Sequence, residues 1–223
     1  MKRLRLCLTL TLALLLITTS VASAGRNANP GVLPPEARVQ GLTLGEWDAK
    51  EWQAITAIPA SQNPVAGAPW TDCYVERIGN VGLGIAFFEE TGTFACEMPP
   101  GTVLFQPIVG VFCSNLFGDG ETEEELRACA MSYVPEDVQA SVDGVPVQNL
   151  GDYLFITPLV EFTLPDDNIF GLPPGEGIAV LHDTAFLLAP LSPGQHTLHL
   201  QGSFPEFDFY YDWVFEITVT NER

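Results

Sequence analysis

The chain has 223 residues, of which 47 % are hydrophobic, and it carries 28 acidic side chains against 9 Lys and Arg, a formal net charge of −19. A hydrophobic fraction of this size supports a folded core and argues against intrinsic disorder. The acidic balance argues against nucleic acid and anionic membrane surfaces as partners, because both are bound mainly through Lys and Arg.

The N-terminus has the features of a secretory signal peptide, which we place at residues 1–24. Three basic residues at positions 2–5 precede an apolar run at 6–17 and a small-residue cleavage site at 22–24. The apolar run is shorter than the roughly 20 residues that a membrane-spanning helix needs. We therefore expect a secreted protein, extracellular or in the periplasm or cell envelope, with no transmembrane span after signal cleavage.

The remaining chain reads as an extended arm followed by a single domain. Residues 25–41 are polar and contain prolines, and residues 42–223 form the domain. Its 18 Pro and 20 Gly indicate many turns between short strands. We expect a mainly β fold, an antiparallel β-sandwich of the Ig-like or jelly-roll-like kind, with one or two short α-helices.

The first half of the domain begins with a helix and continues with strands. The apolar periodicity predicts a helix over residues 44–58, which Pro59 ends. Strands at 84–88 and 93–97 flank a predicted hairpin loop at 89–92. Residues 103–113 are apolar on both faces, as in a central strand, and Pro107 predicts a bulge within it.

The second half contains one capped helix and many strands. Thr122-x-x-Glu125 matches a capping box and predicts a helix that runs to about Ser132. Asp143-Gly144 predicts a hairpin turn. Residues 207–220 alternate between apolar and mostly polar positions, which predicts a strand with one buried face. Other strands are expected at 138–142, 145–149, 153–157, 159–164, 178–182, 184–189 and 196–201.

Four cysteines follow the signal peptide, namely Cys73, Cys96, Cys113 and Cys129. An even number of cysteines in an exported chain predicts disulfides, and their spacing matches no zinc pattern. Of the pairings that four cysteines allow, we favour Cys73–Cys96 and Cys113–Cys129. The second pair would attach the capped helix to the end of the central strand.

The chain also resembles a group of secreted bacterial proteins of uncharacterised function. The resemblance covers most of the mature chain through an ordered set of short motifs, among them Gly45-Glu46-Trp47, Trp52-Gln53, Ile58-Pro59, Asn63-Pro64, Pro99-Pro100-Gly101, Leu126-Arg127-Ala128-Cys129 and Ser192-Pro193-Gly194-Gln195-His196-Thr197. It implies a secreted, single-domain, β-rich protein, and it implies no activity.

Catalytic motifs give little direction. The sequence holds no Gly-x-Ser-x-Gly, no His-Glu-x-x-His and no phosphate-binding loop. His196 and His199 lie three apart in a predicted strand, so they face opposite sides and do not share a metal easily. A Ser/His/Asp arrangement from distant parts of the chain stays open.

Oxygen-rich loops are candidate calcium sites. Asp119, Glu121 and Glu123 alternate like the start of a calcium loop, although the glycine and final glutamate of an EF-hand are missing. Asp166 and Asp167 form a second cluster. Turn formation and helix capping explain the same residues without a metal, and we favour that explanation.

Aromatic residues in the N-terminal segment are candidate ligand-binding residues. Trp47, Trp52, Trp70 and Tyr74 would form a stacking platform for sugar rings if they were exposed. Burial in the core is the more frequent fate of large aromatic side chains.

We therefore expect a non-catalytic binding protein, with an extracellular polysaccharide or a cell-surface component as partner and calcium as a candidate cofactor. The alternatives are a hydrolase or lyase that acts on polysaccharide or another polymer through carboxylates, and a structural surface or matrix component. Convergence of Glu89, Asp119, Asp166 and His182 in a pocket, with shifted carboxylate pKa values, would favour the enzyme.

Overall fold

The computed structural model describes residues 29, 31–86 and 91–220, which form a mainly β fold with two helices, α1 (Leu44–Ala57) and α2 (Glu123–Met131). A six-stranded sheet has the order β1-β2-β4-β9-β7, and β8 also pairs with β9. Its strands are β1 (Glu76–Ile78), β2 (Val81–Leu83), β4 (Val103–Ser114), β7 (Leu154–Ile156), β8 (Val160–Leu164) and β9 (Gly175–Leu188).

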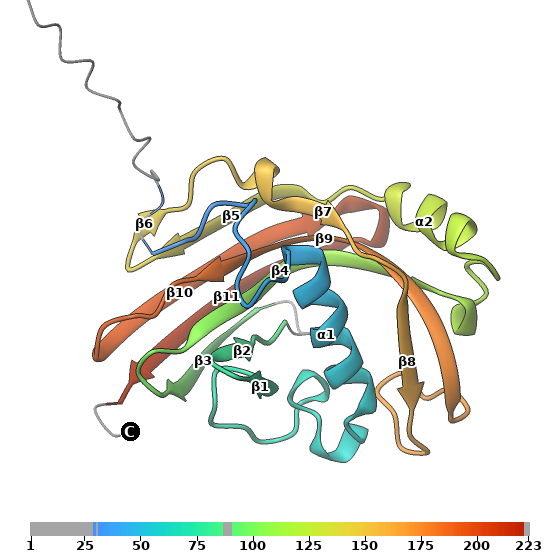
Figure 1. Ribbon diagram of the computed structural model, residues 1–223, viewed down its shortest axis with the longest axis horizontal. Helices are drawn as coiled ribbons and strands as arrows, with labels where there is room; N and C mark the ends of the chain where they lie inside the picture. The colour runs from blue at the N-terminus through green and yellow to red at the C-terminus, as the bar shows by residue number, and fades with distance from the viewer. Residues whose placement is uncertain (1–28, 30, 87–90, 221–223) are drawn as a thin grey trace, which may run out of the picture.

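A five-stranded sheet has the order β3-β11-β10-β5-β6. Its strands are β3 (Thr91–Met98), β5 (Glu136–Val142), β6 (Val145–Pro146), β10 (Gly194–Phe204) and β11 (Phe209–Val219). One hydrophobic cluster includes residues of both sheets, such as Phe186 of β9 and Phe215 of β11. The predicted β-sandwich with two short helices is thereby confirmed (Figure 1).

Both sheets are mixed, whereas the sequence predicted antiparallel ones. β2 runs parallel to β4, and β3 runs parallel to β11. The hairpin predicted for residues 84–97 is wrong: residues 84–86 follow β2 outside any strand, and β3, which corresponds to the second predicted strand, pairs with β11 in the other sheet. Residues 87 and 88 of the first predicted strand are not among the described residues. Residues 89 and 90 of the predicted turn lie outside the described residues.

The long antiparallel pair β4–β9 forms the centre of the six-stranded sheet. The predicted bulge is present, since the register shifts between Pro107 and Val109, where proline has no N–H to donate. β9 is one continuous strand, although the sequence suggested two strands separated by Asp183. Its centre is buried on both faces, and both α1 and α2 contact it.

The β11 strand follows the predicted alternation. Tyr211, Trp213, Phe215, Ile217 and Val219 are all buried. Each such side chain stabilises the fold by roughly 1.5–3 kcal/mol through removal of apolar surface from water. The strand begins at Phe209, because residues 205–207 form a 3-10 turn.

The N-terminal arm runs beside the C-terminal end of β9. Val32 forms an antiparallel bridge with Leu188, and the Leu33 N–H donates to the Leu187 carbonyl at 2.8 Å. The chain then enters α1, which lies across the six-stranded sheet and contacts β8 most extensively (Figure 1).

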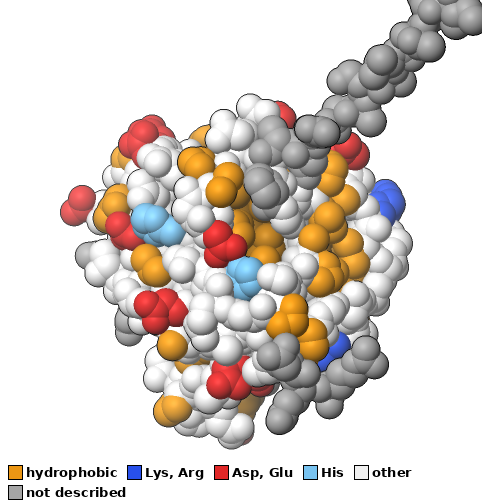
Figure 2. Space-filling model, turned by 90° about the vertical axis from the view of Figure 1, so that its left-hand side faces the viewer, with side chains coloured by type: hydrophobic (Ala, Val, Ile, Leu, Met, Phe, Trp, Pro, Cys, Tyr) orange, Lys and Arg blue, Asp and Glu red, His pale blue; other side chains and the backbone are white. Residues whose placement is uncertain are grey.

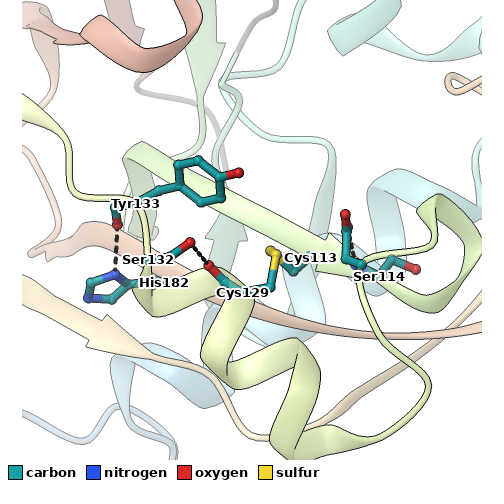
Figure 3. Close-up of a disulfide and its surroundings, with 7 residues drawn as sticks. Cys113, Ser114, Cys129, Ser132, Tyr133 and His182 are labelled. Carbon is teal, nitrogen blue, oxygen red and sulfur yellow. Dashed lines mark hydrogen bonds between the residues drawn. A yellow bond between two sulfur atoms is a disulfide. The ribbon is translucent and has the colours of Figure 1, made fainter.

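Both favoured disulfides are present, Cys73–Cys96 and Cys113–Cys129. The second connects the end of β4 to α2 (Figure 3). Beyond α2, the Tyr133 carbonyl accepts a hydrogen bond from His182 Nδ1 of β9 at 3.2 Å, which fixes the Nδ1–H tautomer of that ring. Neither α1 nor α2, the two α-helices of the described residues, is long and apolar enough to cross a bilayer.

Candidate functional site

Helix α1 places carboxyl groups against the six-stranded sheet. Thr43 and Glu46 form a capping box that begins the helix: the Thr43 N–H donates to Glu46 Oε2 at 2.8 Å, and the Glu46 N–H donates to Thr43 Oγ1. Asp48, Glu51 and Ile55 then follow at spacings of three and four, so they share one helix face. That face is buried, which leaves two carboxyl groups inside the protein.

Strand β9 brings a third carboxyl group to the same region. Leu181, Asp183 and Ala185 alternate along β9 and share a face. Asp183 pairs with Gly110 of β4, where a Cβ atom would lie only 2.3 Å from Asp183 Cγ. The missing side chain at Gly110 is therefore what leaves room for the Asp183 carboxyl.

A cavity of about 500 Å³ adjoins these groups, and Glu51 and Asp183 both line it. Six consecutive residues of β4, 107–112, also line it. Side chains alternate between the two faces of a strand, so this pattern places the cavity along an edge of β4. On that side β2 pairs only with Val103–Phe105, so it does not cover residues 107–112 of β4, which line the cavity.

The cavity wall is largely apolar and aromatic. Trp52 of α1 packs on Phe112 with ring centroids 4.6 Å apart, and Phe112 lies 5.8 Å from Phe170. Phe204 and Phe209 contribute from the five-stranded sheet. The exposed side chain of Phe117 also lines the cavity, which places one part of the lining at the protein surface.

The three carboxyl groups are buried without hydrogen-bonding partners for several of their oxygens. Asp48, Glu51 and Asp183 are 0 %, 1 % and 2 % exposed. Both oxygens of Asp48, Oε2 of Glu51 and Oδ1 of Asp183 make no hydrogen bond with any residue that the structure describes. Such groups destabilise a fold unless something else compensates them, so their presence calls for a functional explanation.

Burial keeps these acids protonated. It raises the pKa of Asp48 and Glu51 well above the ordinary values, and the Asp183 carboxyl raises both further by repulsion. Burial also raises the pKa of Asp183 to about 7, against the effect of a backbone hydrogen bond from Thr184. The two acids that line the cavity, Glu51 and Asp183, therefore favour the protonated, hydrogen-bond-donating form below about pH 7, and a positive charge brought near them favours the ionised form.

The carboxyl oxygens do not form a metal site. Within the described ranges, the one set of three or more potential donor atoms lying within 4.8 Å of one another belongs to Cys113, Asp119 and Cys129. Its two sulfur atoms are joined in a disulfide, so they are not available as thiolate ligands.

The predicted aromatic residues lie in different environments. Trp47 is fully buried and donates its indole N–H to the Val39 carbonyl at 3.2 Å. Trp52 lines the cavity. Trp70 is half-buried with its ring 6.1 Å from Phe94, and the half-buried Tyr74 packs over Gly82. The structure therefore places one of the four in the candidate site, and sugar stacking by this group stays a prediction.

The predicted calcium ligands have other contacts. Asp119 accepts from the Ser114 N–H at 2.9 Å, Glu123 pairs with Arg127 at 2.6 Å, and Asp167 accepts from the Ser61 N–H at 3.0 Å. Glu121 and Asp166 are exposed. Calcium binding stays a prediction.

The residues named for the enzyme hypothesis do not meet in the cavity. Asp119, Asp166 and His182 are absent from the described lining, and Glu89 lies outside the described residues. Other carboxyl groups converge instead, namely Glu51 and Asp183 with Asp48 behind them.

A Ser/His/Asp arrangement does assemble on the surface, at the start of β10. His196 Nδ1 lies 2.8 Å from Asp143 Oδ2, and Nε2 lies 3.4 Å from Ser192 Oγ. However, Nε2 is closer to the Ser192 carbonyl oxygen, at 2.8 Å, and a carbonyl only accepts. Both ring nitrogens therefore donate, so His196 is held as an imidazolium that ties the β5–β6 turn to β10, and it is no general base.

His199, on the opposite side of β10 from His196, pairs with Asp212 of β11 at 2.7 Å. The prediction that the two histidines do not share a site agrees with these separate partners. Neither ring lies in the cavity lining.

Sequence reasoning missed the three buried acids. One usable signal was the Thr43-x-x-Glu46 capping box, which gives Glu46 a structural role but leaves Asp48 and Glu51 without one. Another was Asp183, which lies between the apolar stretches 178–181 and 185–188 of β9. Neither signal shows that α1 packs on β9.

No family model, curated protein or solved structure matches this chain. The resemblance to secreted bacterial β-rich proteins therefore stays a prediction.

Proposed function

We propose that the protein is an exported, non-catalytic binding protein that holds a small, largely apolar molecule in the cavity between α1 and β4. The observation that carries this proposal is the cavity itself, with its aromatic wall and two carboxyl oxygens, Glu51 Oε2 and Asp183 Oδ1, that lack hydrogen-bonding partners among the described residues. Ligand sites are typically apolar cavities of this size with a few polar groups that orient the ligand.

Export is supported by the signal-like N-terminus and by the two disulfides, which form and persist in oxidising compartments. N-terminal sequencing of the mature protein is expected to begin at Gly25. A mature chain that still begins at Met1 would contradict export by signal cleavage.

The cavity favours an apolar ligand over a carbohydrate. Sugar hydroxyls need many hydrogen-bonding partners, while the described wall offers chiefly the carboxyls of Glu51 and Asp183 and the indole N–H of Trp52. A polysaccharide that binds elsewhere on the surface would leave cavity variants unaffected.

The test is saturable binding of the uncharged dye N-phenyl-1-naphthylamine, followed by its fluorescence. Ala86→Phe fills part of the cavity and is expected to weaken dye binding strongly. Ala66→Phe, at an exposed alanine outside the lining, is the matched control and should bind like the wild type. Absence of saturable binding, or equal binding by both variants, would contradict the proposal.

A second candidate function is acid–base catalysis on an apolar substrate. It is favoured by one observation, the raised carboxyl pKa values of Glu51 and Asp183 at the cavity wall. Turnover of a bound ligand that is lost in Asp183→Asn, while binding remains, would support catalysis over binding alone.

A further inference from the structure

We propose that the ligand of the cavity is an organic cation, an amine with an apolar body, whose ammonium group pairs with Glu51 and Asp183; this assignment rests on the binding function above. It names the charge and the chemical class of the ligand, which the cavity alone does not give.

The charge of the site points to a cation. Glu51 Oε2 and Asp183 Oδ1 lack hydrogen-bonding partners within residues 31–86 and 91–220, and no Lys, Arg or His side chain lines the described wall. An ammonium group brings three donors and a positive charge to two acceptors in a low-dielectric site, where the attraction is strong. An anionic ligand would add like charge as the acids ionise, and a neutral ligand would supply no positive charge to stabilise their ionised form.

The aromatic wall suits the same ligand. Phe112 packs against both Trp52 and Phe170, and the three rings line the cavity together with Glu51. Ring faces attract ammonium groups, most strongly where water is excluded, and they also pack against the apolar body of the ligand. A metal ion does not fit as well, because the three carboxyl groups do not bring their oxygens within 4.8 Å of one another.

The surface of the protein favours the approach of cations. The formal net charge is −19, and Figure 2 shows one face on which acidic side chains are spread widely while Lys and Arg lie near the edge. A field of this sign raises the local concentration of cations and speeds their association.

Cation binding is coupled to proton release. Asp183 acts electrostatically on three other buried titratable groups, Asp48 and Glu51 of α1 and Tyr211 of β11. In the free protein burial favours the protonated acids, whereas an ammonium group favours the ionised form, so a proton leaves as the ligand binds. The affinity for an amine therefore rises with pH across the neutral range, and the affinity for a neutral analogue does not.

The experiment compares three probes of nearly equal shape, 2-naphthylmethylamine, 2-naphthylmethanol and 2-naphthoic acid, as competitors of the uncharged dye. At about pH 8 we expect the amine to bind at least about tenfold tighter than the alcohol, and the acid to bind weakest. In the Glu51→Gln/Asp183→Asn double variant the advantage of the amine should disappear, while dye and alcohol still bind.

Asp48→Asn is the matched control, because Asp48 is a buried acid of the same helix that does not line the cavity. It should keep the preference for the amine. Equal loss of the preference in Asp48→Asn and in the double variant would overturn the assignment to Glu51 and Asp183.

The outcomes separate the two proposals. If the dye and the alcohol bind the wild type but the amine has no advantage, the cation assignment fails and the binding function stands. If none of the probes binds, the binding function itself fails. Should the double variant not fold, the wild type alone decides, because an amine affinity that stays flat from about pH 5 to about pH 8 would overturn the proposal.

Discussion

Helix α1 carries glutamates in two opposite environments. Glu46 is half-buried at the N-terminus of the helix, where hydrogen bonds from the Thr43 backbone and hydroxyl, followed by the charge of Arg38, lower its pKa. Glu51 lies on the sheet-facing side of the same helix, where burial and then Asp183 raise its pKa. The first carboxylate stabilises the helix, and the second destabilises the fold. The comparison separates acids that build the structure from acids that the structure holds for another purpose.

The largest expected effect is on the pH dependence of stability. The pKa of Asp183 is about 7 in the folded state against 3.8 for the ordinary group, so the folded state keeps a proton that the unfolded state releases. The free energy of unfolding therefore falls as pH rises through this window, by roughly 4 kcal/mol in total. Asp183→Asn should remove this fall and be more stable than the wild type at about pH 8, as measured by urea unfolding over a pH series.

Asp167→Asn gives the contrasting control. Hydrogen bonds from Ser61 lower the pKa of Asp167, so its contribution is present above the unfolded pKa and is lost as pH falls through the lowered value. This variant should lose stability at neutral pH, in the direction opposite to Asp183→Asn. If the free energy of unfolding depended on pH in the same way for the wild type and Asp183→Asn, the contrast between structural and buried acids would be contradicted.

A smaller effect is expected where Asp183 meets β4. Gly110→Ala places a Cβ atom 2.3 Å from Asp183 Cγ and should destabilise the protein by about 1–3 kcal/mol, which chemical unfolding measures. Gly151→Ala, where nothing lies within 4 Å, is the control. The Gly110→Ala/Asp183→Gly double variant removes the whole Asp183 side chain, including the Cβ atom at 2.8 Å, so it should lose less stability than the two single changes add up to, and strict additivity would contradict the packing described here.

The next effect on stability comes from the capping box at the start of α1, in which Glu46 is the structural carboxylate. Thr43→Ala removes the partner of Glu46 in the capping box and should lower the free energy of unfolding by about 1 kcal/mol. Thr71→Ala, at an exposed threonine outside the helices, is the control. A Thr43→Ala variant as stable as this control would mean that Glu46 is not structural either.

The smallest effect concerns the His196–Asp143 pair. Partial burial acts against both shifts. The hydrogen bond between the two side chains, together with the one that His196 donates to the Ser192 carbonyl, raises the pKa of His196, and the same bond together with the one from the Thr197 N–H lowers the pKa of Asp143. The stabilisation is therefore greatest at mildly acidic pH, since it is lost as pH rises through the raised value and as pH falls through the lowered one. NMR titration should show a lower His196 pKa in Asp143→Asn, and an unchanged midpoint would count against the pair.

Local signals predicted much of the fold. The periodicity of α1, the Thr122 capping box of α2, the alternation of β11 and the bulge at Pro107 all depend on neighbouring residues, and the structure confirms each of them. The sheet assignment of β3 depends on pairing with β11, more than a hundred residues later, which no local pattern shows.

The candidate site escaped prediction for the same reason. The prediction of the helix used its apolar positions and gave Asp48 and Glu51 no role, and Asp183 fell between two predicted strands. Only the packing of α1 on β9, with Gly110 opposite Asp183, turns these three polar residues into buried ones. Tertiary contact overrides the ordinary preference of carboxylates for water in this part of the molecule.

The contrast between ionised structural acids and protonated buried acids is tested most directly by infrared spectroscopy of the carboxyl groups at about pH 6, where exposed carboxylates are ionised. The account predicts a band from protonated carboxyl groups in the folded wild type, weaker in Asp183→Asn and in Asp48→Asn and absent after unfolding in urea. A folded protein with no protonated carboxyl band at this pH would show that the buried acids are ionised and compensated, and it would contradict the account.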